Sequence, residues 1–113
     1  RTGLIYDETR EARRWINPDL PNWNIESSQG PEKWVFNYAD DPRPWNNLVI
    51  RCEGTRIATT LNGMVMSDYN GAGVLNDADH QKHRVGMKGH IALQLHAKDE
   101  LRLQFKDVFV REL

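Results

Sequence analysis

The sequence lacks the features that would place it in several common protein classes. It has one cysteine, Cys52, which excludes an internal disulfide and a zinc site built from several cysteines. No apolar run approaches the ~20 residues that a membrane-spanning helix needs. Its 15 basic and 16 acidic residues leave a net charge of −1, which predicts no basic surface for nucleic acid. At 113 residues the chain is one domain at most, because domains usually run to ~100–200 residues.

Helical periodicity is almost absent, and short alternating segments take its place. Apolar and polar residues alternate over residues 47–53 and again over 56–61, and the pattern resumes at Met64. Asn62-Gly63 separates the second and third segments. Asn-Gly is the strongest short-range hairpin signal, because a type I′ turn needs φ > 0 at both central residues. The sequence therefore predicts a three-stranded antiparallel meander.

Further strands are predicted on both sides of this meander. Residues 90–96 alternate, and residues 101–110 alternate with a change of phase across Lys106-Asp107 that predicts a β-bulge. A strand is also expected over residues 2–6. Such a set of strands predicts an all-β fold, either a sandwich or a barrel. Residues 33–38 are a candidate strand and residues 40–44 a turn, residues 8–15 are predicted as a short charged helix or loop, and residues 17–31 as loop.

A long connection joins the meander to the C-terminal strands, and such loops are usually functional or poorly ordered. One helical turn is predicted between Asp77 and His83. Within it, His80 and His83 lie near Asp77 and Asp79, and two histidines with a carboxylate can bind zinc. The spacing offers no third fixed ligand, so a structural role is favoured and no metal site is assigned.

The strand over residues 90–96 places Gln94 and His96 on one face, opposite Leu93 and Leu95. Histidine is the natural base or acid near neutral pH, and a glutamine amide can hold a substrate hydroxyl. The same pattern is typical of a solvated polar face, or of a histidine bonded to a neighbouring backbone group. Periodicity alone leaves these alternatives open.

Several motifs in a fixed order relate the chain to a known family. A Trp-Asn pair precedes the meander, Asn-Gly forms its hairpin, and a Gly-x-Ile-x-Leu-Gln-x-His strand leads to the last strand. With the segment around Tyr6 and the aromatic Trp15, they resemble the 3-keto-disaccharide hydrolase domain family over essentially the whole chain. The segments are residues 3–8, 15, 45–46, 62–63, 89–96 and 105–113.

The resemblance implies a concanavalin-like jelly-roll β-sandwich with ligand on its concave sheet. The family's domain has further strands upstream of Gly3. We therefore expect residues 1–113 to be one domain that is incomplete at its N-terminus, the C-terminal part of a larger β-sandwich. The resemblance also implies a bacterial protein that is periplasmic or exported.

The activity that the resemblance implies is cleavage of a glycoside oxidised to a ketone at C3. A base removes the C2 proton, the enolate expels the C1 substituent, and water then adds. His96 and Gln94 are the predicted catalytic residues, and Glu8 or Asp7 completes the set. No cofactor is assigned, and a divalent metal stays an alternative to a hydrogen-bond donor at the enolate oxygen.

Three residues near the N-terminus are predicted to bind the carbohydrate. Tyr6 shares a strand face with Glu8, whereas Asp7 opposes them. Trp15, beside Arg14, is the best placed of the tryptophans to stack on a sugar, because aromatic faces cover C–H surfaces.

Two other interpretations of the chain stay open. One is a non-catalytic carbohydrate-binding module on the same sandwich, because a fold does not dictate a function. The other is a partner-dependent piece, which self-associates or takes its missing strands from another chain. Cys52, in phase with Leu48 and Ile50, is predicted to be buried and unreactive.

Overall fold

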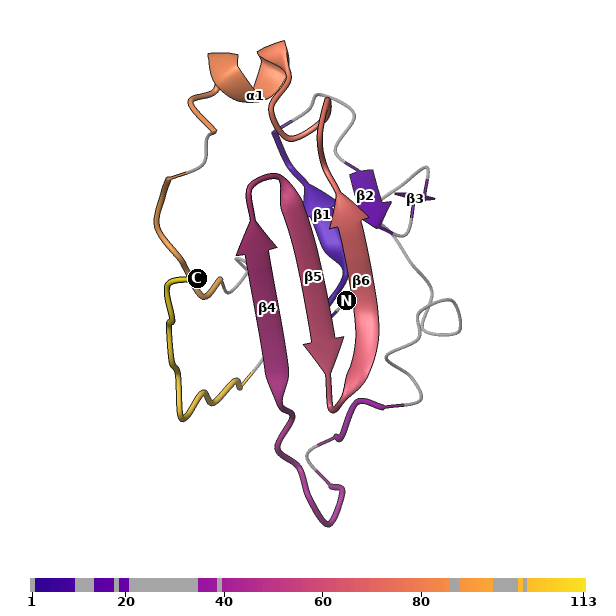
Figure 1. Cartoon of the computed structure of the whole chain (residues 1–113). Helices are drawn as coiled ribbons and strands as arrows, with labels where there is room; N and C mark the ends of the chain where they lie inside the picture. The colour runs from indigo at the N-terminus through magenta and orange to yellow at the C-terminus, as the bar shows by residue number, and fades with distance from the viewer. Residues whose placement is uncertain are drawn as a thin grey trace.

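The computed structural model describes residues 2–9, 14–17, 19–20, 35–38, 40–85, 88–94, 100 and 102–113. The described strands form two antiparallel sheets of three strands each (Figure 1). The first contains β1 (Ile5–Asp7), β2 (Arg14–Asn17) and β3 (Asp19–Leu20); the second contains β4 (Leu48–Glu53), β5 (Arg56–Leu61) and β6 (Met64–Asn70). The described part of the chain adds one short helix, α1 (Ala78–Lys82), so the all-β prediction is confirmed. No helix in the described part of the chain is long and apolar enough to cross a membrane.

The second sheet is the predicted meander, and its register is regular from one hairpin to the next. β4 pairs with β5 from Leu48↔Leu61 to Glu53↔Arg56, and β5 pairs with β6 across the second hairpin. At that hairpin Asn62 has φ 49° and Gly63 has φ 87°. Positive φ at both central residues is what a type I′ turn requires, so the Asn-Gly prediction is confirmed.

A β-bulge in β6 turns two consecutive side chains toward the interior. Thr59 pairs with Ser67 whereas Thr60 pairs with Val65, so Met66 is the extra residue on β6. In a regular strand Met66 and Ser67 would point to opposite faces. Both are nevertheless buried, at 7% and 3% exposed, because the bulge interrupts the alternation.

The two sheets meet where the chain approaches β1. The carbonyl of Gly3 accepts hydrogen bonds from the hydroxyls of Thr59 and Ser67, the latter at 2.9 Å. Gly3 has φ +79°, and a Cβ atom placed on it would lie 2.8 Å from Cβ and Cγ of Met66. Only glycine fits this close approach without strain. The bulge and Gly3 therefore form one junction, beside the fully buried Leu61.

The edge strand β4 lies beyond this junction, and its side chains are exposed throughout. The register confirms that Cys52 and Ile50 share a face with Ile57 and Thr59, their partners on β5. Burial of Cys52 was the wrong expectation, because its thiol is free and exposed. Gly3, just before β1, bonds residues of β5 and β6, and β2 lies against β6, whereas the side chains of β4 are exposed (Figure 1).

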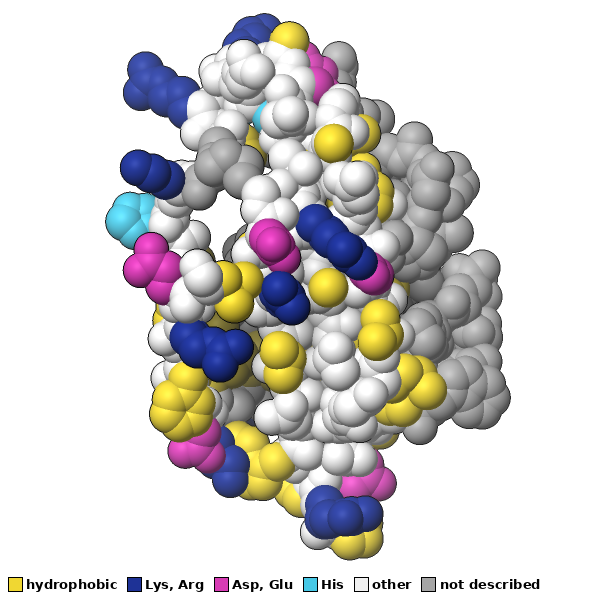
Figure 2. All heavy atoms as spheres, in the orientation of Figure 1, with side chains coloured by type: hydrophobic (Ala, Val, Ile, Leu, Met, Phe, Trp, Pro, Cys, Tyr) yellow, Lys and Arg dark blue, Asp and Glu magenta, His cyan; other side chains and the backbone are white. Residues whose placement is uncertain are grey.

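The opposite face of the meander carries charges of both signs. Figure 2 shows basic and acidic side chains side by side over the middle of these strands, with hydrophobic side chains scattered around them. Arg56 donates two hydrogen bonds to Asp68, at 2.8 and 2.7 Å, and Arg51 pairs with Glu53 at 3.0 Å. Hydrogen bonding from Arg56 lowers the pKa of Asp68 below its ordinary value. This face therefore has paired surface charge and no excess of either sign.

The predicted C-terminal strands are not found as strands in the described residues. Residues 88–94 and 102–113 have no regular secondary structure, and Ile91, Phe105 and Val110 are exposed. Alternation fixes which side chains share a face, but a strand also needs a neighbour to complete its ladder. The expected bulge is instead a bend at Asp107, which has φ 51°.

The first half contains more strand than its irregular pattern predicted. β1 begins at Ile5, within the expected segment, and extends one residue further. β2 and β3 lie in stretches predicted as loop, or as loop and short helix. The candidate strand over residues 33–38 is not found in its described part, residues 35–38. Their pairing is short, with Trp15↔Leu20 and Ile16↔Asp19 as partners, and of these side chains Ile16 belongs to the buried core.

Candidate active site

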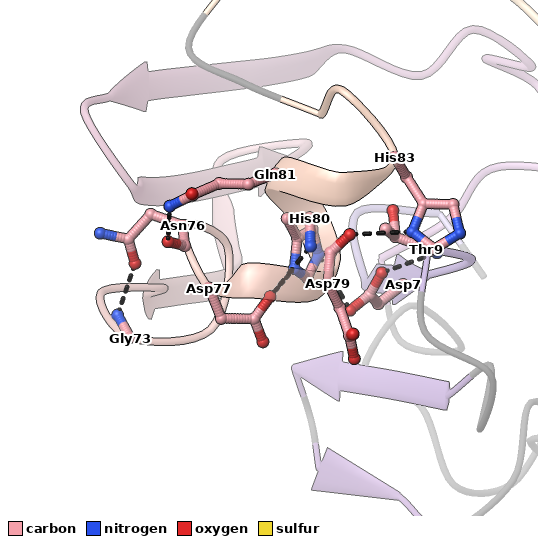
Figure 3. A network of polar contacts seen from close by, with 9 residues as sticks. All are labelled: Asp7, Thr9, Gly73, Asn76, Asp77, Asp79, His80, Gln81 and His83. Carbon is pink, nitrogen blue, oxygen red and sulfur yellow. Dashed lines mark hydrogen bonds and ion pairs between the residues drawn. The ribbon is translucent and has the colours of Figure 1, made fainter.

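A buried histidine faces two carboxylates where α1 meets the end of β1 (Figure 3). His80, from α1, is 1% exposed, and Asp7, the last residue of β1, is 5% exposed. The His80 ring lies between the carboxylates of Asp7 and Asp77. Its Nδ1 is 2.8 Å from Asp77 Oδ1, and its Nε2 is 3.3 Å from Asp7 Oδ2. The contact to Asp77 has hydrogen-bond geometry, whereas the longer contact to Asp7 is an ion-pair distance without that alignment.

Local sequence chemistry explains how α1 presents this ring. Asp77 is the N-cap residue, and its Oδ1 accepts the backbone N–H of His80 at 3.0 Å. Aspartate is a preferred N-cap because its side chain satisfies an amide left free at the helix start. The same oxygen contacts the His80 ring, so the cap fixes both the helix start and the imidazole.

The loop before α1 is built to hold that cap in place. The amide of Gly71 donates to the carbonyl of Thr55 at 3.0 Å, and Leu75 donates back to Gly71 at 2.7 Å. Asn76 accepts from the amide of Gly73 at 2.7 Å and, through its carbonyl, from the side chain of Gln81 at 3.0 Å. The predicted helical turn is confirmed, and the described part of the long connection is a compact hydrogen-bonded structure.

On the other side, Asp7 holds the backbone that follows β1. Its Oδ1 accepts the amide of Thr9 at 2.9 Å, while its Oδ2 faces His80. Glu8, between them, is exposed, and Tyr6 is half-buried. The expected alternation therefore separates the two neighbouring carboxylates, one inside the protein and one at its surface.

The number of protons on the His80 ring decides how many of the two carboxylates it can donate a hydrogen bond to. A neutral imidazole has a single N–H, so it can donate to one carboxylate only. An imidazolium carries N–H groups at both nitrogens and can pair with both. When Nε2 carries a proton, the ring removes part of the cost of burying Asp7, because a buried charge without a partner is strongly unfavourable.

The other residues predicted for the site fall into two groups. The strand register sets Tyr6 opposite Trp15 and Asp7 opposite Arg14, so four of the predicted residues are neighbours on β1 and β2. Gln94 is exposed, in a stretch without regular secondary structure. His96 lies outside the described residues, and the shared face that it was predicted to form with Gln94 stays a prediction.

Comparison with known proteins bears on what such a site serves. A family model described as the 3-keto-alpha-glucoside-1,2-lyase-like domain matches residues 1–111. The chain belongs to this family. The resemblance inferred from the ordered motifs is thereby confirmed, and the domain is related to proteins that act on 3-keto-glycosides. No curated protein and no solved structure matches the chain.

The Trp-Asn and Asn-Gly motifs, which carry the resemblance to the 3-keto-alpha-glucoside-1,2-lyase-like domain, lie close together in the structure. The side-chain amide of Asn62 donates to Asn46 Oδ1 at 2.8 Å, and its Oδ1 accepts the amide of Asn47 at 2.8 Å. Asn46 in turn exchanges two hydrogen bonds with the backbone of Asn37, at 2.7 and 2.8 Å. The Trp-Asn and Asn-Gly motifs thus form one polar network that joins the β5–β6 turn to the entry of β4.

Trp45, from the same motif, is 45% exposed and partly covered by a cation. Lys106 Nζ lies 4.3 Å from the centroid of its ring, within the range of a cation–π contact. This contact holds the C-terminal segment near the entry of β4.

The two histidines of the His-x-x-His motif point to different partners. His83 is exposed, and its Nδ1 contacts the carbonyl of Asp79 at 2.8 Å, whereas His80 points toward Asp7. No group of three His, Cys, Asp or Glu side chains in the described residues is arranged to hold a metal ion. The sequence therefore singled out His80 for its spacing to His83, whereas in the structure its ring contacts Asp77 at the start of α1 and Asp7 at the end of β1.

Proposed function

We propose that this domain cleaves glycosides that carry a ketone at C3, by elimination across C1 and C2 followed by hydration. The observation that carries the proposal is the family match over residues 1–111. The description of that family names a 1,2-lyase of 3-keto-alpha-glucosides, and a 1,2-lyase breaks the C1–O bond as the C2 proton leaves.

The chemistry follows from the ketone. The C3 carbonyl acidifies the C2–H bond, so a side-chain base of modest strength can take the proton and leave an enolate. The enolate electrons then form the C1–C2 double bond and expel the C1 substituent, which takes up a proton as it leaves. Water added across that double bond returns a hydrogen to C2 and places a hydroxyl on C1. The site must supply a base, a donor to the enolate oxygen and a proton for the leaving group.

We assign His96 as the base or acid and Gln94 as the residue that orients the ketone or a neighbouring hydroxyl. Glu8 is the better of the two carboxylates to face a substrate, because its side chain is exposed whereas Asp7 is buried against His80. Tyr6 lies in β1, two residues before Glu8; it is half-buried and can contribute an aromatic surface and a hydroxyl.

Arg14 and Trp15 complete the proposed substrate-binding set. The register of β1 with β2 supports this assignment, because Trp15 is the partner of Tyr6 and Arg14 is the partner of Asp7. A sugar bound along β1 would therefore meet residues of both strands.

The direct test is incubation of the protein with a 3-keto disaccharide, with and without a chelator, while released sugar is measured. We expect turnover by the wild type and a loss of roughly 10²-fold or more for His96→Ala, as removal of a general base or acid typically costs 10²–10⁴-fold. Glu8→Gln, which keeps the shape and removes the charge, is expected to lower turnover more than His83→Ala. His83 is the matched control, because it is exposed and its ring contacts the Asp79 carbonyl of its own helix.

Three other results would each change one part of the proposal. Binding of the 3-keto disaccharide without any release of sugar would replace the enzyme by a binding module. Full activity of His96→Ala would remove His96 from its assigned role. Loss of turnover with chelator would assign the enolate oxygen to a metal ion in place of hydrogen-bond donors alone.

A further inference from the structure

His80 is the described histidine whose environment differs most from solvent. It is 1% exposed, whereas His83 and His90 are exposed. Burial of a polar ring is unfavourable unless its nitrogens find partners. The partners of His80 come from two separate elements, Asp77 at the start of α1 and Asp7 at the end of β1.

From this arrangement we infer that His80 is a positioning residue, which holds the end of β1 in the geometry that the proposed sugar chemistry needs. The inference deepens the proposed function and rests on it. His80 is not proposed to contact the substrate. It acts through Asp7 on the backbone that carries Tyr6 and Glu8.

The α1 side of the contact is fixed independently of β1. Asp77 Oδ1 binds both the backbone amide and the ring Nδ1 of His80, at 3.0 and 2.8 Å. The amide of Gly71 ties the preceding loop to Thr55 in the β4–β5 turn. The ring is thus held by its own element, and Nε2 is the atom directed toward β1 (Figure 3).

The β1 side transmits this constraint to the backbone. Asp7 uses Oδ2 toward His80 Nε2 and Oδ1 toward the amide of Thr9, at 3.3 and 2.9 Å. Because one rigid carboxylate makes both contacts, its orientation sets the path of the chain from Asp7 to Thr9. Glu8 lies inside that short span, so the direction of its exposed side chain depends on the same carboxylate.

The alternative is that His80 only fills space, and two near-isosteric substitutions separate the roles. A glutamine amide can reach the position of Nε2 and still donate toward Asp7, whereas an asparagine amide reaches only the position of Nδ1, near Asp77. We expect His80→Asn to lower kcat on the 3-keto disaccharide by about 10²-fold with little change in KM, the loss typical of a catalytic group displaced by ~1 Å. His80→Gln should recover most of that loss. The control His83→Gln, on the same helix, should match the wild type.

A second measurement does not depend on turnover. Hydrogen exchange of the Thr9 amide reports whether Asp7 is still oriented, since that amide donates to Asp7 Oδ1. We expect exchange at Thr9 to become up to roughly tenfold faster in His80→Asn, the factor that one hydrogen bond of about 1.4 kcal/mol provides. It should stay close to the wild-type rate in His80→Gln and His83→Gln.

Equal kcat values for His80→Gln and His80→Asn would overturn the inference, as would an unchanged Thr9 exchange rate in His80→Asn. An effect on KM alone would also contradict it, because it would indicate a contact made equally with substrate and transition state. If the wild type releases no sugar, the proposed function fails, and the Thr9 measurement still decides whether His80 positions the end of β1. If His80→Asn does not fold, Asp7→Asn provides the same comparison, because it keeps the volume of the carboxylate and weakens both of its contacts.

Discussion

Replacement of Gly3 by alanine tests how the two sheets are joined. A Cβ atom at this position would lie 2.8 Å from Cβ and Cγ of Met66, and Gly3 has φ +79°. The Cβ of Met66 is fixed to its backbone, so a change of rotamer does not relieve that contact. The backbone must move, and Gly3 is also the residue whose carbonyl binds the hydroxyls of Thr59 and Ser67.

Two separate terms set the size of the effect. Positive φ costs an L-residue about 1–2 kcal/mol. Overpacking in a well-packed site costs typically another 1–3 kcal/mol. Gly73 isolates the first term, because it also has φ +79° and has no atom within 4 Å of its hypothetical Cβ. We therefore predict that Gly3→Ala lowers the free energy of unfolding by about 2–5 kcal/mol, and Gly73→Ala by about 1–2 kcal/mol.

Urea denaturation of the two variants and the wild type, followed by circular dichroism, gives both values on one scale. The decisive quantity is the difference between the two alanine variants, since the backbone term is common to them. If Gly3→Ala is no less stable than Gly73→Ala, the close approach between Gly3 and the Met66 bulge does not hold the sheets together.

Three further predictions concern the meander. Leu61→Ala is expected to destabilise the fold by about 2–5 kcal/mol, whereas Ile50→Ala on exposed β4 should change stability by under about 1 kcal/mol; denaturant unfolding measures both. The lowered pKa of Asp68 means that its pairing with Arg56 stabilises the fold above the ordinary carboxyl pKa of about 3.9, and that this contribution disappears as pH falls through the lower folded value. Asp68→Asn should therefore remove a small, salt-sensitive component of stability at neutral pH and leave strongly acidic conditions unchanged; a salt-independent loss would contradict it. Cys52, being exposed, should react with a thiol reagent in the native protein about as fast as in urea, and protection in the native state would mean that β4 is covered.

The meander was predictable because its signals are local. Alternation fixes which side chains share a face, and the Asn62-Gly63 turn fixes the register, since both residues must have positive φ. The bulge at Met66 was not predictable in the same way. Met64, Val65 and Met66 continue the alternation in the sequence, and the extra residue is explained only by its packing against Gly3, in the turn before β1.

Burial was less predictable than phase. Cys52 and Thr59 lie on the same face of the meander, yet Cys52 is exposed and Thr59 is 5% exposed. Thr59 bonds the carbonyl of Gly3, from a distant part of the chain, and no periodicity within a strand records such a contact. Ile91 and Phe105 illustrate the same limit, because their alternating segments are exposed and have no ladder in the described structure.

In the candidate site, the sequence predicts which side chains share a face but not which of them are buried. Alternation on β1 correctly separates Asp7 from Glu8, but it assigns neither of them to the interior. That choice is made by His80, which comes from a connection far along the chain and supplies the partner that a buried carboxylate requires. The acidic His-x-x-His spacing drew attention to His80 for metal binding, a role that the described residues do not support. Its place between Asp7 and Asp77 gives the same residue a different significance, because it connects the loop after the meander to the end of β1, the strand that carries Tyr6.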